Sequence, residues 1–581
     1  MDLGAILPRV TKPARYTGGE WNAVHKDHAS ARARFAFVYP DAYEVGMSHL
    51  GLHILYHVLN THPDYLAERA YSPWPDMEQE MRAAGLPLLS LESRLPLGDF
   101  DVIGITLPYE LTYANLLNVL DLAGLPLRAA DRGPDAPLVI GGGPGAVNPE
   151  PLAEFFDAIL IGEAEDAIIE IAEAAALRNR AAALARLADI AGLYVPSRYQ
   201  YAPAGPGPVG SVTPVDGAPA RIARRFVADL DAAPFPTRQL VPFLDTVHSR
   251  VTLELMRGCA RGCRFCQARA AYSPRRERSV ATLLRQADEA VAATGYDEIS
   301  LLAFTSADYR HIDDLVGELV ARFGRRGVGV ALPSLRADAF SVSLANKIQE
   351  VRKSGLTFAP EAGTQRLREV IRKQVSEDDL FAAADAAFSS GWHRLKLYFM
   401  IGLPTETDED VEAIGDLVNR LLAFGRGALG SRRGRLHLAV SVAAFVPKPH
   451  TPFQWAAQDD VETIARKQKI LQRTMRERAI KLSWTDPSVS LLEAAISRGD
   501  RRVGGAIAAA WRRGARFDAW GEHFDSSRWQ QAFAEVGLDM RDYANRPLDH
   551  DAPLAWDHID CGTDRAALSS EAQRALAGGE G

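Results

Sequence analysis

The sequence predicts an α/β protein: an N-terminal doubly wound domain, then a partial parallel (β/α)6 barrel, then a mainly helical C-terminal region. Three observations support this prediction. Short apolar runs alternate with amphipathic stretches over residues 35–199 and again over 246–480, as expected for parallel strands covered by helices. A proline- and glycine-rich stretch within 200–245 predicts a linker between the two series. Residues 481–581 continue with helical periodicity and a tryptophan-rich stretch.

The length and composition are those of a multidomain globular protein. A chain of 581 residues is too long for one core, and a prior of ~150 residues per domain gives three or four domains. The formal net charge of −8 argues against a large nonspecific nucleic-acid surface, which needs a basic excess. No apolar run reaches the ~20 residues that span a bilayer, and residues 1–21 lack the apolar centre of a secretory signal. We therefore expect a cytoplasmic protein with no membrane partner.

The first series predicts four buried strands and three helices. Residues 1–34 precede them without clear periodicity, and we expect an irregular arm there. The strands are FAFVYP, FDVIGITLP, PLVIGGG and DAILIGE, and the helices are 46–60, 110–123 and 163–177. Buried strands that alternate with helices predict a parallel sheet covered on both faces.

The second series predicts six strands: VTLELM, EISLLAF, GVGVALP, LTFAP, HRLKLYFMIG and RLHLAVSVAAF. Helical segments separate them, for example at 280–293, 311–323, 341–353 and 407–424. Six repeated strand–helix units suit a partial parallel barrel, which presents its chemistry at the C-terminal ends of its strands.

Three of the four cysteines lie close together, directly after the first predicted barrel strand. They are Cys259, Cys263 and Cys266, in the segment RGCARGCRFC. A tight, odd-numbered group in a large chain is typical of metal binding rather than of a disulfide scaffold. Thiolates are the preferred ligands of iron–sulfur clusters, and three of them leave one iron of a [4Fe–4S] cluster open to a further ligand. A zinc site with a distant fourth ligand and three incidental thiols are the alternatives, although no nearby histidine completes a zinc pattern.

This spacing, with an aromatic residue just before the last cysteine, resembles the signature of the radical S-adenosylmethionine (SAM) superfamily. Phe265 occupies the aromatic position. The resemblance implies that the open iron binds the amino and carboxylate groups of SAM. One electron, from a donor such as a flavodoxin or a ferredoxin, then splits the sulfonium into methionine and a 5′-deoxyadenosyl radical. That radical serves hydrogen abstraction from, or methylation of, a substrate that the sequence does not identify.

The family's motif for the methionine amino group falls on Ser306, Ala307 and Asp308, without its glycines. Asp308 can accept a hydrogen bond from an ammonium, and an ordinary helix N-cap is the alternative for Ser306 and Asp308. The third predicted strand ends near Ser334 and Arg336, where a guanidinium suits the carboxylate of SAM or of a substrate.

The resemblance assigns two further positions to SAM. Glu361, at the end of the fourth predicted strand, matches the acidic residue that binds the ribose hydroxyls in related enzymes. Gly402, Leu403 and Pro404 form a turn after the fifth strand, where the backbone can approach the adenine. This turn is similar to the family's glycine-containing adenine motif, whose first glycine is absent.

The N-terminal domain resembles the cobalamin-binding domain that many radical SAM enzymes carry. The motif Asp-x-His-x-x-Gly of that domain matches Asp41 to Gly46, with Tyr43 in place of the cobalt-ligating histidine. Gly141, Gly142 and Gly143 match the turn that lies against the nucleotide tail of cobalamin. Two interpretations remain open: the domain binds cobalamin without this lower ligand, or it has kept its turns for packing and has another role.

The tryptophan-rich tail resembles that of an uncharacterised radical SAM family with the same domain order. Because related radical enzymes modify tRNA, RNA is a candidate substrate. The best basic patch for it comprises Arg501, Arg502, Arg512, Arg513 and Arg516, for which a solvated surface is the alternative. Cys561 is a candidate redox-active thiol, with an inert thiol as the alternative.

Two other classes of function compete with the enzyme. One is a non-catalytic iron–sulfur redox sensor or electron carrier. The other is a cobalamin-responsive module with a vestigial radical core. A sensor has no use for Glu361 and Gly402 around an open iron, so these residues favour the enzyme.

Overall fold

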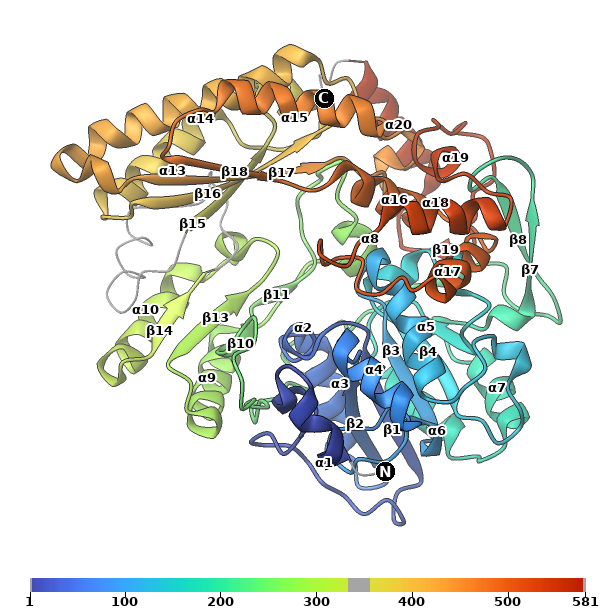
Figure 1. The fold of residues 1–581 in the computed structure, drawn as a ribbon. Coiled ribbons are helices and arrows are strands. Elements are labelled where there is room, and N and C mark those ends of the chain that lie inside the picture. The colour runs from blue at the N-terminus through green and yellow to red at the C-terminus, as the bar shows by residue number, and fades with distance from the viewer. Residues whose placement is uncertain (1–2, 333–355, 578–581) are drawn as a thin grey trace. The chain divides into compact units, whose positions relative to one another are not determined.

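The computed structural model describes residues 3–332 and 356–577 (Figure 1). Within these ranges the protein is an α/β fold with mostly parallel sheets, as predicted. The chain forms two compact units. The first unit contains Met1–Ser249, Ala495–Tyr543 and Asp551–Gly562, and the second contains Arg250–Ala494, Ala544–His550 and Thr563–Gly581. The region beyond residue 481 therefore contributes to both units.

The first unit is built on a six-stranded sheet with the order β2-β1-β3-β4-β5-β6. Strands β1 to β5 are parallel to their neighbours, and β6 is antiparallel to β5. The strands are β1 Ala33–Tyr39, β2 Tyr65–Tyr71, β3 Val102–Thr106, β4 Leu138–Gly142, β5 Ala158–Leu160 and β6 Leu193–Tyr194. Because β2 and β3 lie on opposite sides of β1, the strand order reverses at β1.

Strand β2 is a strand that the apolar pattern did not predict, because it carries charged residues inside a fully buried segment. Arg69 is 0% exposed, and its guanidinium pairs with Glu20 (2.8 Å) and Glu92 (2.6 Å). These two carboxylates compensate a charge that would otherwise be too costly to bury. They come from distant parts of the chain, so the compensation is tertiary.

The helices of the first unit pack on this sheet and on one another. Apolar side chains of α3, α6 and α7 share one core with the side chains of Phe35 and Phe37 on β1. Helix α17 packs against α5 and α18. The helices are α1 Leu3–Ile6, α2 Tyr43–Gly46, α3 Leu50–Thr61, α4 Pro75–Ala84, α5 Tyr113–Leu122, α6 Ala167–Ala175, α7 Arg180–Ala188, α17 Val503–Arg512 and α18 Ser526–Glu535.

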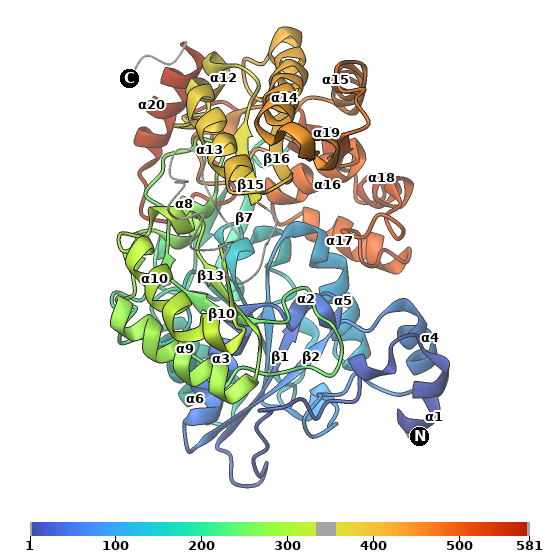
Figure 2. The same cartoon turned by 90° about the vertical axis from the view of Figure 1, so that its left-hand side faces the viewer.

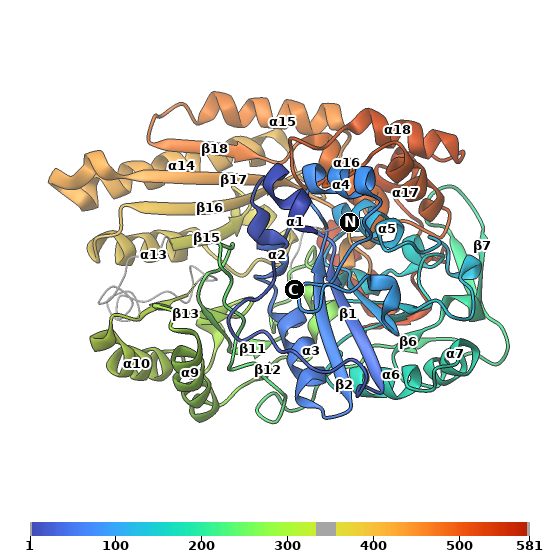
Figure 3. The ribbon, with the colours of Figure 1, turned by 60° about the horizontal axis from the view of Figure 1, so that its bottom comes forward.

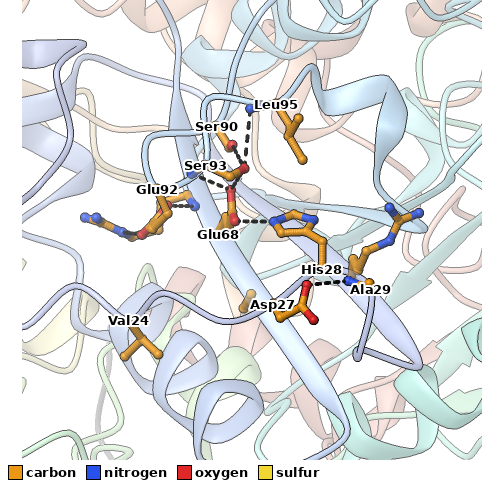
Figure 4. A network of polar contacts seen from close by, with 12 residues as sticks. Val24, Asp27, His28, Ala29, Glu68, Ser90, Glu92, Ser93 and Leu95 are labelled. Atoms are coloured by element: carbon orange, nitrogen blue, oxygen red, sulfur yellow. Dashed lines mark hydrogen bonds and ion pairs between the residues drawn. The ribbon is translucent and has the colours of Figure 1, made fainter.

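The N-terminal arm is held by polar contacts to the edge of the sheet. Figure 4 shows Glu68 of β2 between His28 of the arm and Ser93. Glu68 Oε1 lies 2.6 Å from His28 Nε2, and Glu68 Oε2 accepts a hydrogen bond from the Ser93 hydroxyl at 2.6 Å. The arm is therefore ordered by tertiary contacts, although its own sequence has little periodicity.

The proline- and glycine-rich stretch forms strands as well as turns. Strands β7 Tyr199–Pro203 and β8 Gly210–Pro214 pair as an antiparallel hairpin. Its prolines lie at strand ends, where a missing backbone N–H is tolerated. Strand β9 Ile222–Ala223 then pairs with β19 Ile559–Asp560.

The second unit contains two parallel sheets. One has the order β10-β13-β14, and α9 and α10 lie beside it (Figure 2). The other has the order β15-β16-β17-β18 (Figure 3). The strands are β10 Val251–Glu254, β13 Glu298–Leu302, β14 Gly329–Ala331, β15 Leu356–Glu361, β16 Arg394–Ile401, β17 His437–Ala444 and β18 Ile480–Trp484.

All six strands predicted for this part of the chain are present. Strand β18 is an additional one, parallel to β17, and its short, partly polar sequence IKLSW gave no clear signal. The helices are α9 Val280–Thr294, α10 Ile312–Phe323, α12 Gln365–Val370, α13 Glu377–Ser389, α14 Asp408–Leu429, α15 Val461–Thr474 and α20 Arg565–Leu576; α16 Pro487–Ser497 and α19 Met540–Ala544 span unit boundaries. The predicted helix 341–353 lies outside the described residues. Within the described ranges, no helix has the length and apolar character needed to cross a membrane.

Candidate functional site

The cysteine loop of the second unit is fixed at both ends. It follows β11 Met256–Arg257, which pairs with β12 Arg276–Glu277, and it leads into α8 Ala268–Tyr272. Gly258 begins the loop with φ +83°, and a Cβ there would lie 2.6 Å from the carbonyl oxygen of Tyr272. Only glycine fits both this conformation and this close approach. The loop therefore leaves the sheet at a fixed point.

The three thiols lie near one another but do not converge on one point. The pKa of Cys266 is raised to about 11, mainly by desolvation, and the neighbouring thiols Cys263 and Cys259 raise it further. Across residues 3–332 and 356–577, no three His, Cys, Asp or Glu side chains are close enough to share a single metal ion. A [4Fe–4S] cluster takes each thiolate on a different iron, and three neighbouring thiols on one loop could supply such ligands.

Asp308, one of the predicted SAM residues, lies beside the cysteine loop. The guanidinium of Arg261 binds its carboxylate with two contacts, Nη2–Oδ1 at 2.6 Å and Nε–Oδ2 at 3.0 Å. The backbone amide of Arg261 also donates to the sulfur of Cys259 at 3.4 Å. Arg261 thus joins the first cysteine to Asp308, and an incoming ammonium would compete with it for this carboxylate.

Arg264 fastens the loop to two helices. It is 4% exposed, and its guanidinium donates to the carbonyl oxygens of Glu369 (3.2 Å) and Val370 (2.7 Å) at the end of α12. Its Nε pairs with Glu571 of α20 at 3.0 Å, and the same Glu571 oxygen lies 3.2 Å from Arg372. Positive charge at a helix C-terminus is favourable, and Glu571 balances it. The sequence did not indicate the pair of Arg264 and Glu571, because Glu571 is more than 300 positions from the loop.

One apolar cluster joins the cysteine loop to the ends of three strands. Phe265 packs against a core that includes Ala362, Leu403 and Phe445. Ala362 directly follows β15, Leu403 lies just after β16, and Phe445 directly follows β17. The loop, Glu361 and the Gly402 turn are therefore close together. Pro404 lies in the same turn and is half-buried.

Glu361 ends β15 after an irregularity in the strand pairing and has φ +68°. A non-glycine residue in the left-handed region is uncommon and marks a position that its surroundings hold in place. Its carboxylate pairs with Lys373 at 3.0 Å, and Lys373 is close enough to Cys266 to lower the pKa of that thiol. Lys373, which the sequence did not indicate, thus connects Glu361 to the third cysteine.

The Gly402 turn is held by a buried glutamate. Gly402 has φ +79°, and its amide and that of Leu403 (3.3 Å) both donate to Glu406 Oε2. The Glu406 side chain is 1% exposed and pairs with Lys467 at 3.1 Å. Burial is the main cause that raises the pKa of Glu406 to about 7. In the described part of the chain its other oxygen, Oε1, is buried without a hydrogen-bond partner.

Two of the other predicted SAM positions have no open polar group in the structure. Ser306 is 0% exposed, and its hydroxyl donates to the carbonyl oxygen of Leu301 at 3.0 Å, so it closes its own turn. Ala307 carries no polar side-chain atom. Ser334 and Arg336 lie outside the described residues.

The residues that the resemblance assigns to cobalamin do not fit that group here. Tyr43 is 2% exposed, its hydroxyl donates to Glu20 at 2.8 Å, and burial raises the pKa of its phenol. A Cβ on Gly46 would overlap the ring of Tyr71. A Cβ on Gly141 would lie 3.0 Å from the ring of Phe156, and one on Gly143 would lie 2.9 Å from the carbonyl oxygen of Leu107. A Cβ on Gly142 would have no contact under 3.8 Å. Protein atoms therefore pack closely against Gly46, Gly141 and Gly143.

The five arginines of the predicted basic patch are all paired with carboxylates. The pairs are Arg501–Glu150 (2.9 Å), Arg502–Asp500 (2.6 Å), Arg512–Glu535 (3.0 Å), Arg513–Glu535 (2.7 Å) and Arg516–Glu78 (3.2 Å). Neutralised guanidiniums attract phosphates weakly, so this cluster gives RNA no clear binding surface. Cys561 is 3% exposed, and burial raises the pKa of its thiol to about 12, which is typical of an unreactive cysteine.

The chain is similar to known proteins in sequence and in fold. Among curated proteins, the uncharacterised protein MJ0966 of Methanocaldococcus jannaschii is 29% identical over 471 residues, which cover 81% of this chain and 89% of that protein.

Among solved structures, TsrM from Kitasatospora setae, a radical SAM methyltransferase with cobalamin and a [4Fe–4S] cluster bound, has 16% identity. The match covers 75% of this chain and 78% of that chain, with a TM-score of 0.49. OxsB, a cobalamin-dependent SAM radical enzyme with aqua-cobalamin and SAM bound, has 12% identity. That match covers 94% of this chain and 78% of the other, with a TM-score of 0.49.

Two sequence families match the chain itself. Residues 253–418, which contain the cysteine loop, match the radical SAM superfamily. Residues 51–196 match the N-terminal region of radical SAM proteins. The chain therefore carries two radical SAM domains, over residues 51–196 and 253–418.

Proposed function

We propose that the second unit binds a [4Fe–4S] cluster through Cys259, Cys263 and Cys266 and cleaves SAM reductively. The resulting 5′-deoxyadenosyl radical serves hydrogen abstraction from, or methylation of, a substrate still to be identified. One observation carries this proposal: a pinned loop with three neighbouring thiols shares an apolar core with the strand ends that carry Glu361 and Gly402. A redox sensor needs the thiols but not these strand ends.

The domain organisation is part of the proposal. We assign residues 1–34 to the arm, 35–199 to a doubly wound domain, 200–245 to a lead-in and 481–581 to the C-terminal region. The parallel strands of the second unit would then form one partial barrel over 246–480, which β18 extends slightly. In such a barrel the cysteine loop follows the first strand and faces the carboxyl ends of the others.

The bound cluster supplies one electron and an open coordination site; the residues of the chain hold and orient SAM. We assign the ribose hydroxyls to Glu361, whose carboxylate can accept from both of them. On binding, the ribose replaces part of the contact between Glu361 and Lys373, which leaves the lysine near the third cysteine. Lys373 then offsets negative charge there.

The adenine is assigned to the backbone of the Gly402 turn, with Pro404 beside it. Glu406 fixes the turn by accepting from two of its amides, so their carbonyls keep one orientation. Phe265, directly before the last cysteine, packs against the apolar cluster and anchors that end of the loop. Asp308 remains the candidate for the methionine ammonium, in exchange for Arg261. Ser306, Ser334 and Arg336 complete the proposed set.

The partners follow from the same chemistry. We propose an electron donor such as a flavodoxin or a ferredoxin, because the cluster must be reduced before SAM is cleaved. Free thiols and an exposed Cys266 suit a reducing compartment, in keeping with a cytoplasmic location. RNA stays a candidate substrate, but the paired arginines do not support it.

Anaerobic reconstitution with iron and sulfide, followed by reduction in the presence of SAM, tests the proposal. We expect ~4 iron atoms per chain, and methionine and 5′-deoxyadenosine as products. Cys263→Ala should lose the cluster, whereas the matched control Cys561→Ala should keep it. Full iron content in Cys263→Ala would contradict the ligand assignment. A reduced wild-type cluster that forms no 5′-deoxyadenosine, even with cell extract as substrate source, would favour the redox sensor.

A further inference from the structure

The carboxyl edge of the first unit's sheet has the topology of a ligand site. In open parallel sheets, ligands bind outside the carboxyl ends of the strands, where the strand order reverses. Here the reversal lies between β1 and β3, and the chain that leaves these strands is Pro40–Tyr43 and Leu107–Glu110. We call the space between these two segments the β1/β3 crevice.

We propose that the chain's own segment 516–524 occupies the β1/β3 crevice in place of a cofactor, so that the first unit binds no cobalamin. The segment is part of the tryptophan-rich region that follows α17, and it belongs to the same compact unit as the sheet. The inference concerns the first unit alone and does not depend on the cluster or on SAM.

Asp41 is the first contact between the crevice and the segment. It lies two residues after the end of β1 and is 1% exposed. Its Oδ1 accepts a hydrogen bond from the indole N–H of Trp520 at 2.9 Å, and its Oδ2 accepts one from the hydroxyl of Tyr109 at 2.9 Å. Asp41 therefore joins the end of β1, the chain after β3 and the C-terminal segment in one network.

Asn115, at the start of α5, makes a second connection. It is 1% exposed, and its amide nitrogen donates to the carbonyl oxygen of Pro40 at 2.9 Å. Its amide oxygen accepts from the backbone N–H of Phe517 at 2.7 Å. Both ends of the side-chain amide are thus used, one by Pro40 of the crevice and one by Phe517 of the segment, and a buried amide without these partners would be costly.

Aromatic packing completes the seat of the segment. The ring of Trp74 lies 4.7 Å from Phe517, 5.1 Å from Trp520 and 5.0 Å from His523, between ring centroids. Phe517 itself is 1% exposed. Edge-on and tilted aromatic contacts at these distances are favourable beyond the burial of apolar area. This packing holds Phe517, Trp520 and His523 against Trp74.

A salt bridge fixes the start of the segment. The guanidinium of Arg516 lies 3.2 Å from Glu78 of α4, and it also donates to the carbonyl oxygen of Trp511 at 3.0 Å. Both side chains of the pair are mostly buried. The segment is therefore attached at Arg516, Phe517 and Trp520, which are spread along it.

The space beside Tyr43, which stands in place of the cobalt-ligating histidine, is also small. Tyr43 and Tyr71 pack edge-to-face at 5.2 Å, and the cavity that they line has a volume of about 40 Å³. A water molecule needs ~10–15 Å³ of such volume, so this cavity admits water but not a nucleotide. The chain thus uses the turns of a cofactor domain to seat its own C-terminal segment.

The test uses the full-length protein, anaerobically reconstituted, incubated with hydroxocobalamin and passed through gel filtration. We expect no retained cobalt. In hydrogen exchange, amides of residues 516–524 should be protected to the same degree with and without hydroxocobalamin. Retention of stoichiometric cobalt would overturn the proposal. If protection of residues 516–524 were lost at the same time, the segment would be a displaceable lid. If protection were kept, cobalamin would bind elsewhere. Rapid exchange of residues 516–524 in the wild type would also overturn it.

Two variants sharpen the test. Trp520→Ala should speed exchange in residues 516–524 roughly tenfold, because it removes a hydrogen bond and ring packing. Trp520→Phe keeps an aromatic ring at this position and should give a smaller increase in exchange rate. It is the milder substitution in case Trp520→Ala fails to fold. Trp484→Ala, on β18 of the second unit, is the matched control and should leave residues 516–524 unchanged. Equal protection in all three variants would contradict the proposal. SAM cleavage is measured separately, so failure of the proposed function would be recognised independently.

Discussion

Two carboxylates stand at the ends of parallel strands in this protein, and they are used in different ways. Asp41, after β1 of the first unit, is 1% exposed and accepts hydrogen bonds from Trp520 and Tyr109. Glu361, at the end of β15 of the second unit, has a side chain 15% exposed and pairs with Lys373. A ligand must break a buried network to reach Asp41, but it need only exchange with one lysine to reach Glu361.

This difference separates topology from function. Both strand ends lie at the edge at which ligands usually bind, yet of these two carboxylates Glu361 is the one that is partly accessible and lies near the cysteine loop. A fold that is able to hold a cofactor is therefore weak evidence that it does so, and the contacts of the edge residues decide. Four measurements, in order of decreasing expected effect, test this distinction.

The largest effect is expected from Glu406, a buried carboxylate inside the second unit. If burial of a carboxylate, rather than the unit in which it lies, decides how much its charge destabilises the fold, protonation of Glu406 should control the stability of the second unit. Its pKa is raised from 4.5 to about 7, so between these values the folded state holds a proton that the unfolded state has lost. Stability then falls as pH rises through this window, by roughly 3 kcal/mol.

Urea unfolding of the wild type and Glu406→Gln between pH 4.5 and pH 7 measures this effect. The difference in unfolding free energy between the two proteins should change by that amount, with the wild type losing stability as pH rises. Glu477→Gln removes an exposed carboxylate and is the matched control. Parallel curves for wild type and Glu406→Gln would show that Glu406 titrates normally.

Asp41→Ala should cost about 2 kcal/mol in the first unit, because the indole of Trp520 and the hydroxyl of Tyr109 lose their acceptor. Glu361→Ala should cost less than ~1 kcal/mol, since Lys373 can turn toward solvent. Hydrogen exchange of amides in β1 and β15 reads the two units separately. Asp41→Asn retains one acceptor oxygen, so its loss of stability should lie between those of Asp41→Ala and Glu361→Ala. Equal losses for Asp41→Ala and Glu361→Ala would remove the contrast between the two edges.

The strands and the cysteine loop could be predicted from sequence because their signals are local. Buried parallel strands appear as continuous apolar runs, and the three cysteines lie within eight residues. Strand β2 was missed because Arg69 is compensated by Glu20 and Glu92, which only the folded chain brings together.

The same limit applies to the candidate site. Glu361 and Gly402 lie at the ends of predicted strands, and the resemblance to the radical SAM superfamily assigned them to SAM. Lys373, Glu406 and Glu571 act on the loop and turns through tertiary contacts, and no spacing in the sequence links them to the cysteines. The role proposed for segment 516–524 was missed for the same reason, although the tryptophan-rich stretch that contains Trp520 was noticed.

Glu361→Gln should weaken SAM binding about tenfold, because the amide keeps one acceptor oxygen but loses the charge that strengthens two hydrogen bonds to the ribose. Isothermal titration calorimetry on the reconstituted protein measures the affinity. Glu377→Gln, which alters an exposed ion pair with Arg420, is the matched control and should bind as the wild type does. Unchanged affinity in Glu361→Gln would mean that this edge is no more a ligand site than the edge at Asp41.

The smallest effect is expected where the C-terminal helix meets the cysteine loop. Glu571→Gln leaves Arg264 with backbone acceptors but without its carboxylate, which should weaken the loop by ~1 kcal/mol and speed iron loss to a chelator about fivefold. Glu535→Gln alters exposed pairs with Arg512 and Arg513 in the first unit and should not change this rate. Iron content before the chelator is added separates a loosened loop from a missing cluster. If Glu571→Gln released iron at the wild-type rate, helix α20 would be packed on the loop without stabilising it, and the open edge of the second unit would depend on its own strands alone.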